Sequence, residues 1–532
     1  MTTPTPGTSA AAPAESEAPP ESPLPPTPWK WRAAIAAAVI GVAFAAYLSS
    51  RGGGGSVKAQ AACGVICFLG TAAFFSTSLQ SVSRKTLLWG VGLQFALALA
   101  VLNVQVVKDA FAIVGGGIET LIKASDKGAE FVFGGLAKVD GPAGFVFAFK
   151  ALPPIIFVSA FFSVLYYFGV LQLLVRLMSK VMQYLMGTSG AETLSVSANV
   201  FMGQTEAPLI VKPYVPKMTR SELLALMGSG MAHISGGMMA VYISYGANAT
   251  AILCTCVMAC PCALYLTKLV YPEAGKPVTL GDTPANVESP YVNAIDAAAG
   301  GVKDGVWLAL NVAAMLIAFI AFIALFDAII GGVKPLLFKA AKQRWIEFVL
   351  LGSAMAVAFR GLWMWRTPGN VRKGAALAGF GFSLFLTIFF LVREASDAKA
   401  NSLAWWPDDL KLETIFGWLF APVAFLLGIE PGETQKVGSL LGIKLAANEH
   451  VAFLKLKEWK AMGTAFLSER SQLIAVFALT GFANFASVGI QLGGIGAIAP
   501  GRRADLAKLG MRALFVGFLA TLINAAVAGL LM

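Results

Sequence analysis

The sequence predicts an all-α polytopic membrane protein, and three observations carry this prediction. The chain is 57% hydrophobic and only 13% charged, roughly half the charged share of soluble domains, so a water-soluble fold would expose far too much apolar surface. Apolar runs approaching the ~20 residues that a helix needs to cross a bilayer recur along the chain. The alternating pattern typical of membrane β-barrels is absent from the sequence.

These runs predict about eleven spanning helices, at 33–50, 60–80, 87–103, 150–175, 223–245, 249–270, 305–330, 346–364, 374–392, 471–497 and 511–531. The first run follows an acidic, Pro- and Ala-rich segment at 1–28, which we expect to be a disordered tail. A signal peptide would begin with a short basic region. We therefore interpret 33–50 as a retained helix, with cleavage as the alternative.

The net charge of +11 raises the question of a nucleic-acid partner. The basic residues are instead spread over short loops between the apolar runs, and no nucleic-acid partner is expected. Four basic loops fall on one face of the membrane, which the positive-inside rule assigns to the cytoplasm: 29–32, 83–85, 211–220 and 501–512. The basic segment 334–344 falls on the other face in the same count, so either it lies along the lipid headgroups or its topology differs.

Six cysteines are present, four of them in "CTCVMACPC" at 254–262. This cluster lacks CxxC spacing and nearby histidines, so we interpret its members as small residues in a packed apolar helix rather than as metal ligands. The chain has two histidines and no HExxH motif. With no recognisable nucleophile and base, we do not expect an enzyme.

A polar segment interrupts the apolar sequence at 199–211, "NVFMGQTEAPLIV". A carboxylate at bilayer depth costs at least ~3 kcal/mol, so Glu206 is unusual there unless it merely begins a cytoplasmic loop. Gly203 and Pro208 interrupt a regular helix, and the preceding polar stretch at 187–199 is too short to span alone. These features favour a re-entrant helical hairpin with a polar tip, tolerated where it lines a cavity.

A second interrupted segment, "GSLLGIKLAANEHVAF" at 438–453, carries Glu449. Each candidate hairpin precedes a hydrophobic helix broken by polar or Gly residues, at 231–246 and 479–494. Paired interrupted segments are typical of inverted-repeat transporters with a site near the bilayer midplane. From the residues alone, this site would combine Gln204, Glu206, Glu449 and Asn484. The paired hairpins argue against a channel.

Several motifs closely resemble the concentrative nucleoside transporter family: "GTSGAETLSVSANVFMGQTEAPLIVKPYV", "NEHVAF", "GFANFASVGIQLGGIGAIAP", "FVFAFKALPPIIFVSAFFSVLYYFGV" and "DGVWLALNVAAMLIAFIAFIALF". The resemblance covers roughly 60–330 and 413–532. It implies ion-coupled uptake (symport) of nucleosides by an elevator-like transport domain in a homotrimer, with no cofactor besides the coupling ion, a proton or sodium. We expect an integral membrane protein of the bacterial cytoplasmic (inner) membrane, surrounded by lipid.

The expected organisation follows from this resemblance and from the apolar runs. It comprises a disordered tail (1–28), an extra N-terminal membrane helix (29–58), scaffold helices with an interfacial helix (59–186), a first transport repeat with hairpin and broken helix (187–275), an interfacial and a scaffold helix (276–332), an inserted helical pair (333–412), and a second transport repeat (413–532). The inserted pair is expected to pack peripherally against the scaffold, since the family core does not need it.

The resemblance implies nine substrate-binding positions: Gly203, Gln204, Thr205, Glu206, Met238, Glu449, Phe482, Asn484 and Ser487. Gln204 and Thr205 match positions that hydrogen-bond the nucleobase, and Glu206 is expected to act through water. The Gly203–Gln204 pair resembles members that accept both purine and pyrimidine nucleosides.

Glu449, Asn484 and Ser487 match the positions that hold the ribose hydroxyls, and Phe482 matches an aromatic that packs on the substrate. This chemistry is sensible because an ionised carboxylate and an amide oxygen accept hydrogen bonds from vicinal hydroxyls. A neutral base needs carboxamide and hydroxyl partners that both donate and accept.

The ion site of the family corresponds to Asn199, the carbonyls of Met202 and Ile234, and His233, which replaces a hydroxyl ligand. Sodium prefers hard oxygen ligands, whereas histidine titrates near neutral pH. The hypothesis from the sequence is therefore proton coupling through His233. Sodium coupling is a close alternative, and a nucleoside receptor that does not transport is another. The second histidine, His450, adjoins Glu449, where the family usually has Phe.

Overall fold

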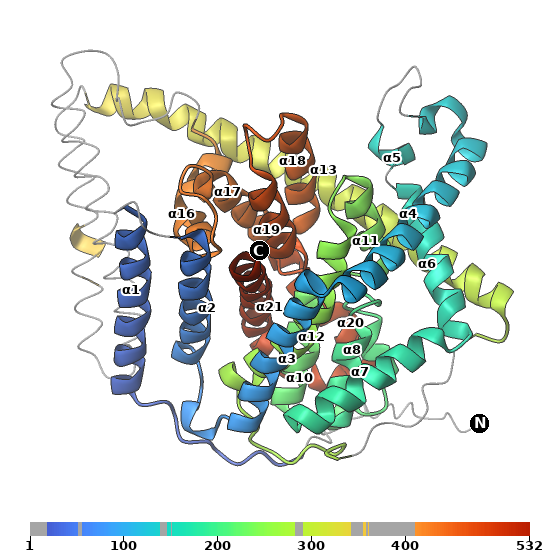
Figure 1. Ribbon diagram of the computed structural model, residues 1–532, viewed down its shortest axis with the longest axis horizontal. Coiled ribbons are helices and arrows are strands. Elements are labelled where there is room, and N and C mark those ends of the chain that lie inside the picture. The colour runs from blue at the N-terminus through green and yellow to red at the C-terminus, as the bar shows by residue number, and fades with distance from the viewer. Residues whose placement is uncertain are drawn as a thin grey trace, which may run out of the picture. The chain divides into compact units, whose positions relative to one another are not determined.

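The structure, a computed structural model, describes residues 19–51, 56–138, 146–150, 152–281, 291–341, 355–357, 360 and 410–532, with only the backbone described at 331–341. The regular elements in these ranges are all helices (Figure 1). This finding confirms the predicted all-α class. The chain forms two compact units, Met1–Leu316 with Phe416–Met532, and Ile317–Ile415.

Eight segments of the described chain are long and apolar enough to cross a membrane: Trp29–Arg51, Val57–Phe74, Arg84–Asn103, Phe147–Tyr167, Arg220–Ser244, Ala249–Val270, Ala294–Ile330 and Pro500–Leu531. The predicted run at 471–497 forms two shorter helices instead. The predicted helices at 346–364 and 374–392 lie outside the described residues, apart from 355–357 and 360. The total of eleven spans therefore stays a prediction.

The first elements are α1 (Trp29–Arg51), α2 (Val57–Phe74), α3 (Arg84–Asn103), α4 (Gln105–Phe133), α5 (Phe147–Lys150), α6 (Leu152–Tyr167) and α7 (Val170–Met186). Ser56 and Ser83 begin α2 and α3 by accepting backbone N–H groups of the first turn. The buried residues of α7 recur every three or four positions, so this helix buries a single face.

The first repeat consists of α8 (Gly190–Ala198), α9 (Ala207–Ile210), α10 (Arg220–Ala232), α11 (Gly236–Ser244) and α12 (Ala249–Val270). We call 190–210 the first hairpin segment. Capping boxes begin α8, at Ser189 with Glu192, and α10, at Thr219 with Glu222. The helix from 220 breaks at 233–235 and restarts because the Ser235 hydroxyl caps α11.

After α13 (Ala294–Ala341), the predicted second repeat at 413–532 contains α16 (Leu412–Leu426), α17 (Thr434–Ala446), α18 (Glu449–Ala461), α19 (Glu469–Leu479), α20 (Phe485–Ile498) and α21 (Arg503–Leu531). We call 434–461 the second hairpin segment. Asn448 caps α18, and Asn484 caps α20 after the break at 480–484. Both repeats thus have the same order: a hairpin segment, a broken helix and a long helix.

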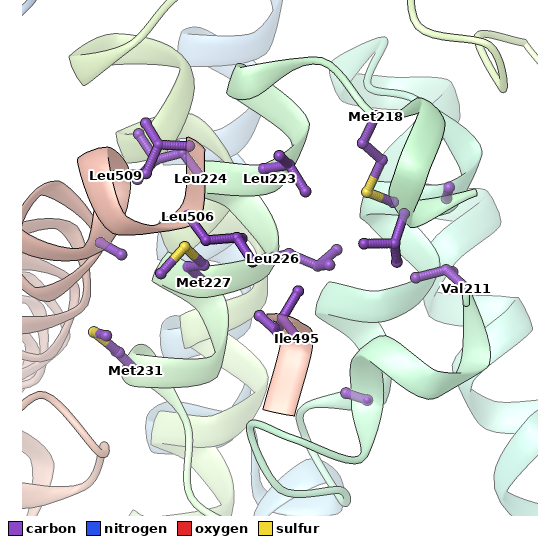
Figure 2. Close-up of a cluster of buried hydrophobic side chains, with 14 of the residues drawn as sticks. Val211, Met218, Leu223, Leu224, Leu226, Met227, Met231, Ile495, Leu506 and Leu509 are labelled. Atoms are coloured by element: carbon purple, nitrogen blue, oxygen red, sulfur yellow. The ribbon is translucent and has the colours of Figure 1, made fainter. Parts of the chain in front are cut away.

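The hydrophobic core joins the two repeats. Leu223, Leu224 and Met227 of α10 pack in one cluster with Leu506 and Leu509 of α21 (Figure 2). In Figure 1, α21 (dark red) also contacts α2, α12, α19 and α20. The long helix of the second repeat therefore supports the broken helices of both repeats.

Three of the basic loops that the sequence analysis assigns to one face are tied to neighbouring loops. Arg220 Nε lies 3.0 Å from Asp505 Oδ1, and Arg502 Nη1 donates to the Pro216 carbonyl oxygen at 3.0 Å. Arg32 Nη2 donates to the Ser76 carbonyl oxygen at 2.9 Å. Of the predicted tail, 19–28 is described and non-helical, and the Thr27 hydroxyl donates to the same Ser76 oxygen at 3.0 Å.

Candidate functional site

Four of the predicted substrate residues form one continuous chain of hydrogen bonds. Asn484 Nδ2 donates to Glu449 Oε2 at 2.9 Å, and Asn484 Oδ1 accepts the backbone N–H of Ser487 at 2.9 Å. At the other end of the chain, Gln204 Nε2 donates to Ser487 Oγ at 3.3 Å. All four side chains are buried. The N-terminus of α20 therefore connects the carboxylate of the second hairpin segment with the carboxamide of the first.

Tyr242 extends this chain, and the sequence analysis did not single it out. Its hydroxyl donates to Glu449 Oε1 at 2.8 Å, so both oxygens of the carboxylate have donors. The Tyr242 ring stacks on Phe453, with ring centroids 4.1 Å apart and planes 13° apart. The sequence feature that could have identified Tyr242 is a phenol within the apolar half-helix that begins directly after the break at 233–235.

The side chain of Glu206 lies in different surroundings from that of Gln204. Its Oε2 accepts the backbone N–H of Gly203 at 2.9 Å, and its side chain lines a cavity of about 500 Å³. Gln204 packs closely on Gly230 of α10. A Cβ at this position would lie 2.9 Å from Gln204 Cβ and 2.6 Å from Gln491 Nε2, so the glycine allows this close approach. The tip of the first hairpin segment thus presents the carboxamide and the carboxylate to different surroundings.

The cavity beside Glu206 is polar as well as apolar, and its volume falls in the range of small-molecule pockets. Its polar lining residues include Ser159, Ser163, Tyr166, Glu206, Lys212, Ser235, Tyr291 and Asp304. Burial, together with the nearby carboxylates, raises the pKa of Tyr291, so its hydroxyl stays protonated and can both donate and accept.

The other predicted substrate residues lie around the same centre. Thr205 packs on α20, where a Cβ at Gly494 would lie 2.7 Å from Thr205 Cγ2. Met238 is buried in the first turn of α11. Phe482 is partly exposed in the break at 480–484, and its backbone N–H donates to the carbonyl oxygen of His233 at 3.0 Å.

The predicted ion residues gather where the first hairpin segment meets the break of α10 and α11. The Gly236 N–H donates to the Phe201 carbonyl oxygen at 3.0 Å, which brings the neighbours of Met202 and Ile234 together. Asn199 is fully buried, and its Nδ2 donates to Ser229 Oγ at 3.0 Å. Its Oδ1 is a buried acceptor without a donor. An oxygen in this condition suits a small cation, since the cation would replace the missing donor.

Both ring nitrogens of His233 contact residues of the adjoining helices α10 and α12. Nδ1 lies 2.7 Å from the Ser229 carbonyl oxygen, and Nε2 lies 3.3 Å from Cys260 Sγ of α12. Because a carbonyl only accepts, Nδ1 carries the proton, and the neutral ring can accept the Cys260 thiol proton at Nε2. The neutral imidazole thus uses both nitrogens in packing contacts.

His450 is buried next to Glu449, at the start of α18. Its Nε2 lies 3.0 Å from the Tyr245 hydroxyl, and its ring meets Phe147 edge-on with centroids 5.4 Å apart. The six cysteines are all free thiols. In the part of the chain that the structure describes, no group of His, Cys, Asp and Glu has a geometry that could hold a metal ion.

Three family models match the chain along most of its length. "Na+ dependent nucleoside transporter N-terminus" matches 63–136, "Nucleoside recognition" matches 148–249, and "Na+ dependent nucleoside transporter C-terminus" matches 251–360 and 377–529. The last match continues through most of the predicted insertion at 333–412 and is interrupted at 361–376.

Individual relatives agree with these matches. An uncharacterized transporter of Haemophilus influenzae is 35% identical over 88% of this chain and 96% of its own length. Sodium/nucleoside cotransporter 1 of Mus musculus is 34% identical over 85% of this chain, which spans 60% of that relative. A solved structure of CNTnw in an inward-facing, substrate-bound state superimposes with a TM-score of 0.71 at 33% identity, over 89% of this chain and 98% of that one.

These matches agree with the site geometry, in which the two hairpin segments and the two broken helices bring the predicted residues together. The apolar helices and the matches identify an integral membrane protein. The chain belongs to the concentrative nucleoside transporter family.

Proposed function

We propose that this protein is a sodium-coupled symporter that carries purine and pyrimidine nucleosides inward across the bacterial cytoplasmic membrane. The observation that carries the proposal is the buried chain from Glu449 through Asn484 and Ser487 to Gln204. It joins a carboxylate and an amide, suited to ribose hydroxyls, to a carboxamide suited to a nucleobase. Relatives named as sodium/nucleoside cotransporters support the same substrate class and ion.

The ribose end of the site is the better defined. Glu449 offers two carboxylate oxygens, which Tyr242 and Asn484 occupy in this structure. A nucleoside hydroxyl would replace or join these donors, and a charge-assisted hydrogen bond is worth about 1.5–3 kcal/mol. At the base end, Gln204 Oε1 is buried without a donor, so it is free to accept from an exocyclic amine or a ring N–H.

Sodium is the ion we propose, although the sequence alone favoured the proton. The unpaired Asn199 Oδ1 is a hard oxygen ligand, and the Gly236–Phe201 backbone hydrogen bond joins the two segments that carry the Met202 and Ile234 carbonyls. The His233 side chain carries no oxygen, and its ring nitrogens contact Ser229 and Cys260. The vacant ligand position would be filled by water, which accompanies sodium readily.

The remaining parts of the proposal follow from the family. The two hairpin segments act as re-entrant hairpins of an elevator-like transport domain, and three copies of the chain form a homotrimer whose protomers work independently. The cavity beside Glu206 adjoins the site and would serve as the route through which the nucleoside leaves or enters.

The deciding experiment is uptake of radiolabelled uridine and adenosine into proteoliposomes, with sodium and proton gradients imposed separately. Sodium coupling predicts accumulation of both nucleosides with an inward sodium gradient and none with a proton gradient alone. Free uracil and adenine should compete poorly, because they lack the ribose that Glu449 recognises. Accumulation with the proton gradient alone would favour the coupling through His233 that the sequence predicts. Binding without any accumulation would instead identify a receptor.

A further inference from the structure

Lys444, in the second hairpin segment, is a completely buried cation. Its Nζ donates to the carbonyl oxygen of Ala478 at 2.7 Å and to Thr521 Oγ1 at 2.9 Å. The ammonium also lies 5.7 Å from the centroid of the Phe518 ring. Among the described residues, the ion pairs do not include Lys444. Burying an ammonium without a carboxylate in direct contact is costly, so its direct hydrogen-bond partners are the neutral groups of Ala478 and Thr521.

The ammonium lies where two helices end. Ala478 belongs to the last turn of α19, which stops at Leu479, and carbonyl oxygens of a last turn lack donors within their own helix. Lys444 itself belongs to the last turn of α17. Both C-termini carry partial negative charge from the helix dipole. This junction is therefore suited to a cation, and Lys444 supplies one that is covalently tethered.

The first repeat has a comparable junction without the fixed charge. Asn199 follows α8 directly, and its Nδ2 donates to the Ser229 hydroxyl in the last turn of α10, whereas Lys444 donates to a backbone carbonyl in the last turn of α19. The long helix that follows contributes Cys260 beside this junction. The second repeat contributes Thr521 from its own long helix. In the first repeat, however, the buried oxygen of Asn199 has no donor.

We propose that Lys444 is a built-in cation that occupies, in the second repeat, the position that an exchangeable sodium ion takes in the first. This inference rests on the proposed sodium coupling. The tethered ammonium supplies the charge that holds the second hairpin segment against α19 and α21. It also offsets the negative charge of Glu449, which stands at the start of α18, just after the hairpin turn. Lys444 is thus a positioning residue, and one sodium ion accompanies each nucleoside.

The test compares Lys444→Gln with Lys444→Arg in the purified full-length protein. The glutamine keeps an N–H donor for Ala478 and Thr521 but removes the charge, whereas the arginine keeps the charge. Uridine binding is measured by titration calorimetry over a series of sodium concentrations. The thermal unfolding midpoint is measured over the same series without nucleoside.

In the wild type, sodium should promote uridine binding with a Hill coefficient of about one. In Lys444→Gln, uridine affinity at low sodium should fall about tenfold or more, which is about 1.4 kcal/mol. High sodium should restore it with a Hill coefficient approaching about two, because a second sodium ion takes the place of the ammonium. The unfolding midpoint of this variant should rise more steeply with sodium than that of the wild type. Lys444→Arg should bind uridine as the wild type does.

Thr521→Val is the matched control, because it removes one hydrogen-bond acceptor and leaves the ammonium in place. Its Hill coefficient for sodium should stay at about one. A folded Lys444→Gln with wild-type affinity for uridine and an unchanged sodium response would overturn the proposal. If the wild type binds uridine without any effect of sodium, the proposed coupling ion is wrong. In that case the affinity difference between Lys444→Gln and Lys444→Arg still decides whether the tethered charge positions the second hairpin segment.

Discussion

The backbone N–H of Phe482 donates to the carbonyl oxygen of His233 across 3.0 Å. These residues stand in the breaks of the two broken helices, so a main-chain hydrogen bond joins the repeats at their centres. The half-helices α11 and α20, which carry the predicted substrate residues Met238 and Ser487, begin immediately after the two breaks. The bond uses no side chain, so it joins the two breaks through the backbone alone.

Gly481→Ala should destabilise this junction. Gly481 has φ +144°, and a Cβ there would lie 2.6 Å from Thr521 Cγ2 and 3.0 Å from the Ala232 carbonyl oxygen. Backbone strain and overpacking together should lower the free energy of unfolding by at least about 2 kcal/mol. The measurement is the thermal unfolding midpoint in detergent.

Gly489→Ala in α20 is the control for this substitution, because no atom lies within 4 Å of its added Cβ. It should raise the free energy of unfolding by up to about 1 kcal/mol, since alanine favours helix. Equal thermal unfolding midpoints for the two variants would show that the junction between the two helix breaks tolerates a side chain at Gly481.

Tyr242→Phe should weaken nucleoside binding without unfolding the protein. The substitution removes the hydroxyl that donates to Glu449 Oε1 and keeps the ring that stacks on Phe453. Loss of one hydrogen bond to a carboxylate should cost about 1–3 kcal/mol in positioning, or roughly a five- to hundredfold increase in the Kd for uridine. Calorimetric titration with uridine provides the measurement.

Tyr245→Phe is the matched control, because this hydroxyl contacts His450 and does not contact Glu449. Its Kd for uridine should stay within about twofold of the wild type, as for a change outside the substrate chain. A larger loss in Tyr245→Phe than in Tyr242→Phe would assign the greater role to His450 instead.

His233→Ser should raise the apparent affinity for sodium. The serine restores a hydroxyl oxygen at the first break and removes a ring whose nitrogens lie against Ser229 and Cys260. Uptake should reach half-maximum at a lower sodium concentration and should change with external pH no more than in the wild type. The measurement is the sodium dependence of uridine uptake at acidic and at neutral external pH. Loss of an acid-stimulated, sodium-independent uptake in this variant would establish proton coupling.

Lys268→Met should destabilise the base of the first repeat. The buried Lys268 Nζ lies 2.8 Å from Glu192 Oε2 and 3.1 Å from Glu273 Oε2. Its removal leaves the buried Glu192 carboxylate unpaired, which should cost about 3–5 kcal/mol in the free energy of unfolding. The thermal unfolding midpoint measures this loss. Lys508→Met, at an exposed position of α21, should change the free energy by no more than about 0.5 kcal/mol.

The double variant Lys268→Met with Glu192→Gln separates the ion pair from packing. Neutralising the orphaned carboxylate should recover part of the lost stability, because the cost arises from an uncompensated buried charge. A double variant as unstable as the single Lys268→Met variant would show that packing of the lysine's aliphatic chain, and not its charge, stabilises the fold.

The sequence by itself determined that this is an all-α membrane protein, because the hydrophobic composition and the length of the apolar runs show that the helices face lipid. It also located both polar interruptions, since Glu206 and Glu449 stand out against apolar surroundings whatever the fold. The sequence also predicted the breaks of the two helices, because Gly and polar residues interrupt their apolar runs. These features are local, and a single sequence is enough to read them.

The sequence predicted that Gln204, Glu206, Glu449 and Asn484 share a site, but only the tertiary structure decided which contacts these groups make. Gln204 and Ser487 are 283 positions apart, and Tyr242 and Glu449 are 207 apart, so no periodicity relates them. At an irregular hairpin tip the side-chain direction is set by backbone dihedrals that no repeat pattern specifies, and Gln204 and Glu206 consequently point to different surroundings. The sequence pattern did not single out Lys444, because its proposed role depends on the end of α19 lying against it, which is decided by tertiary packing.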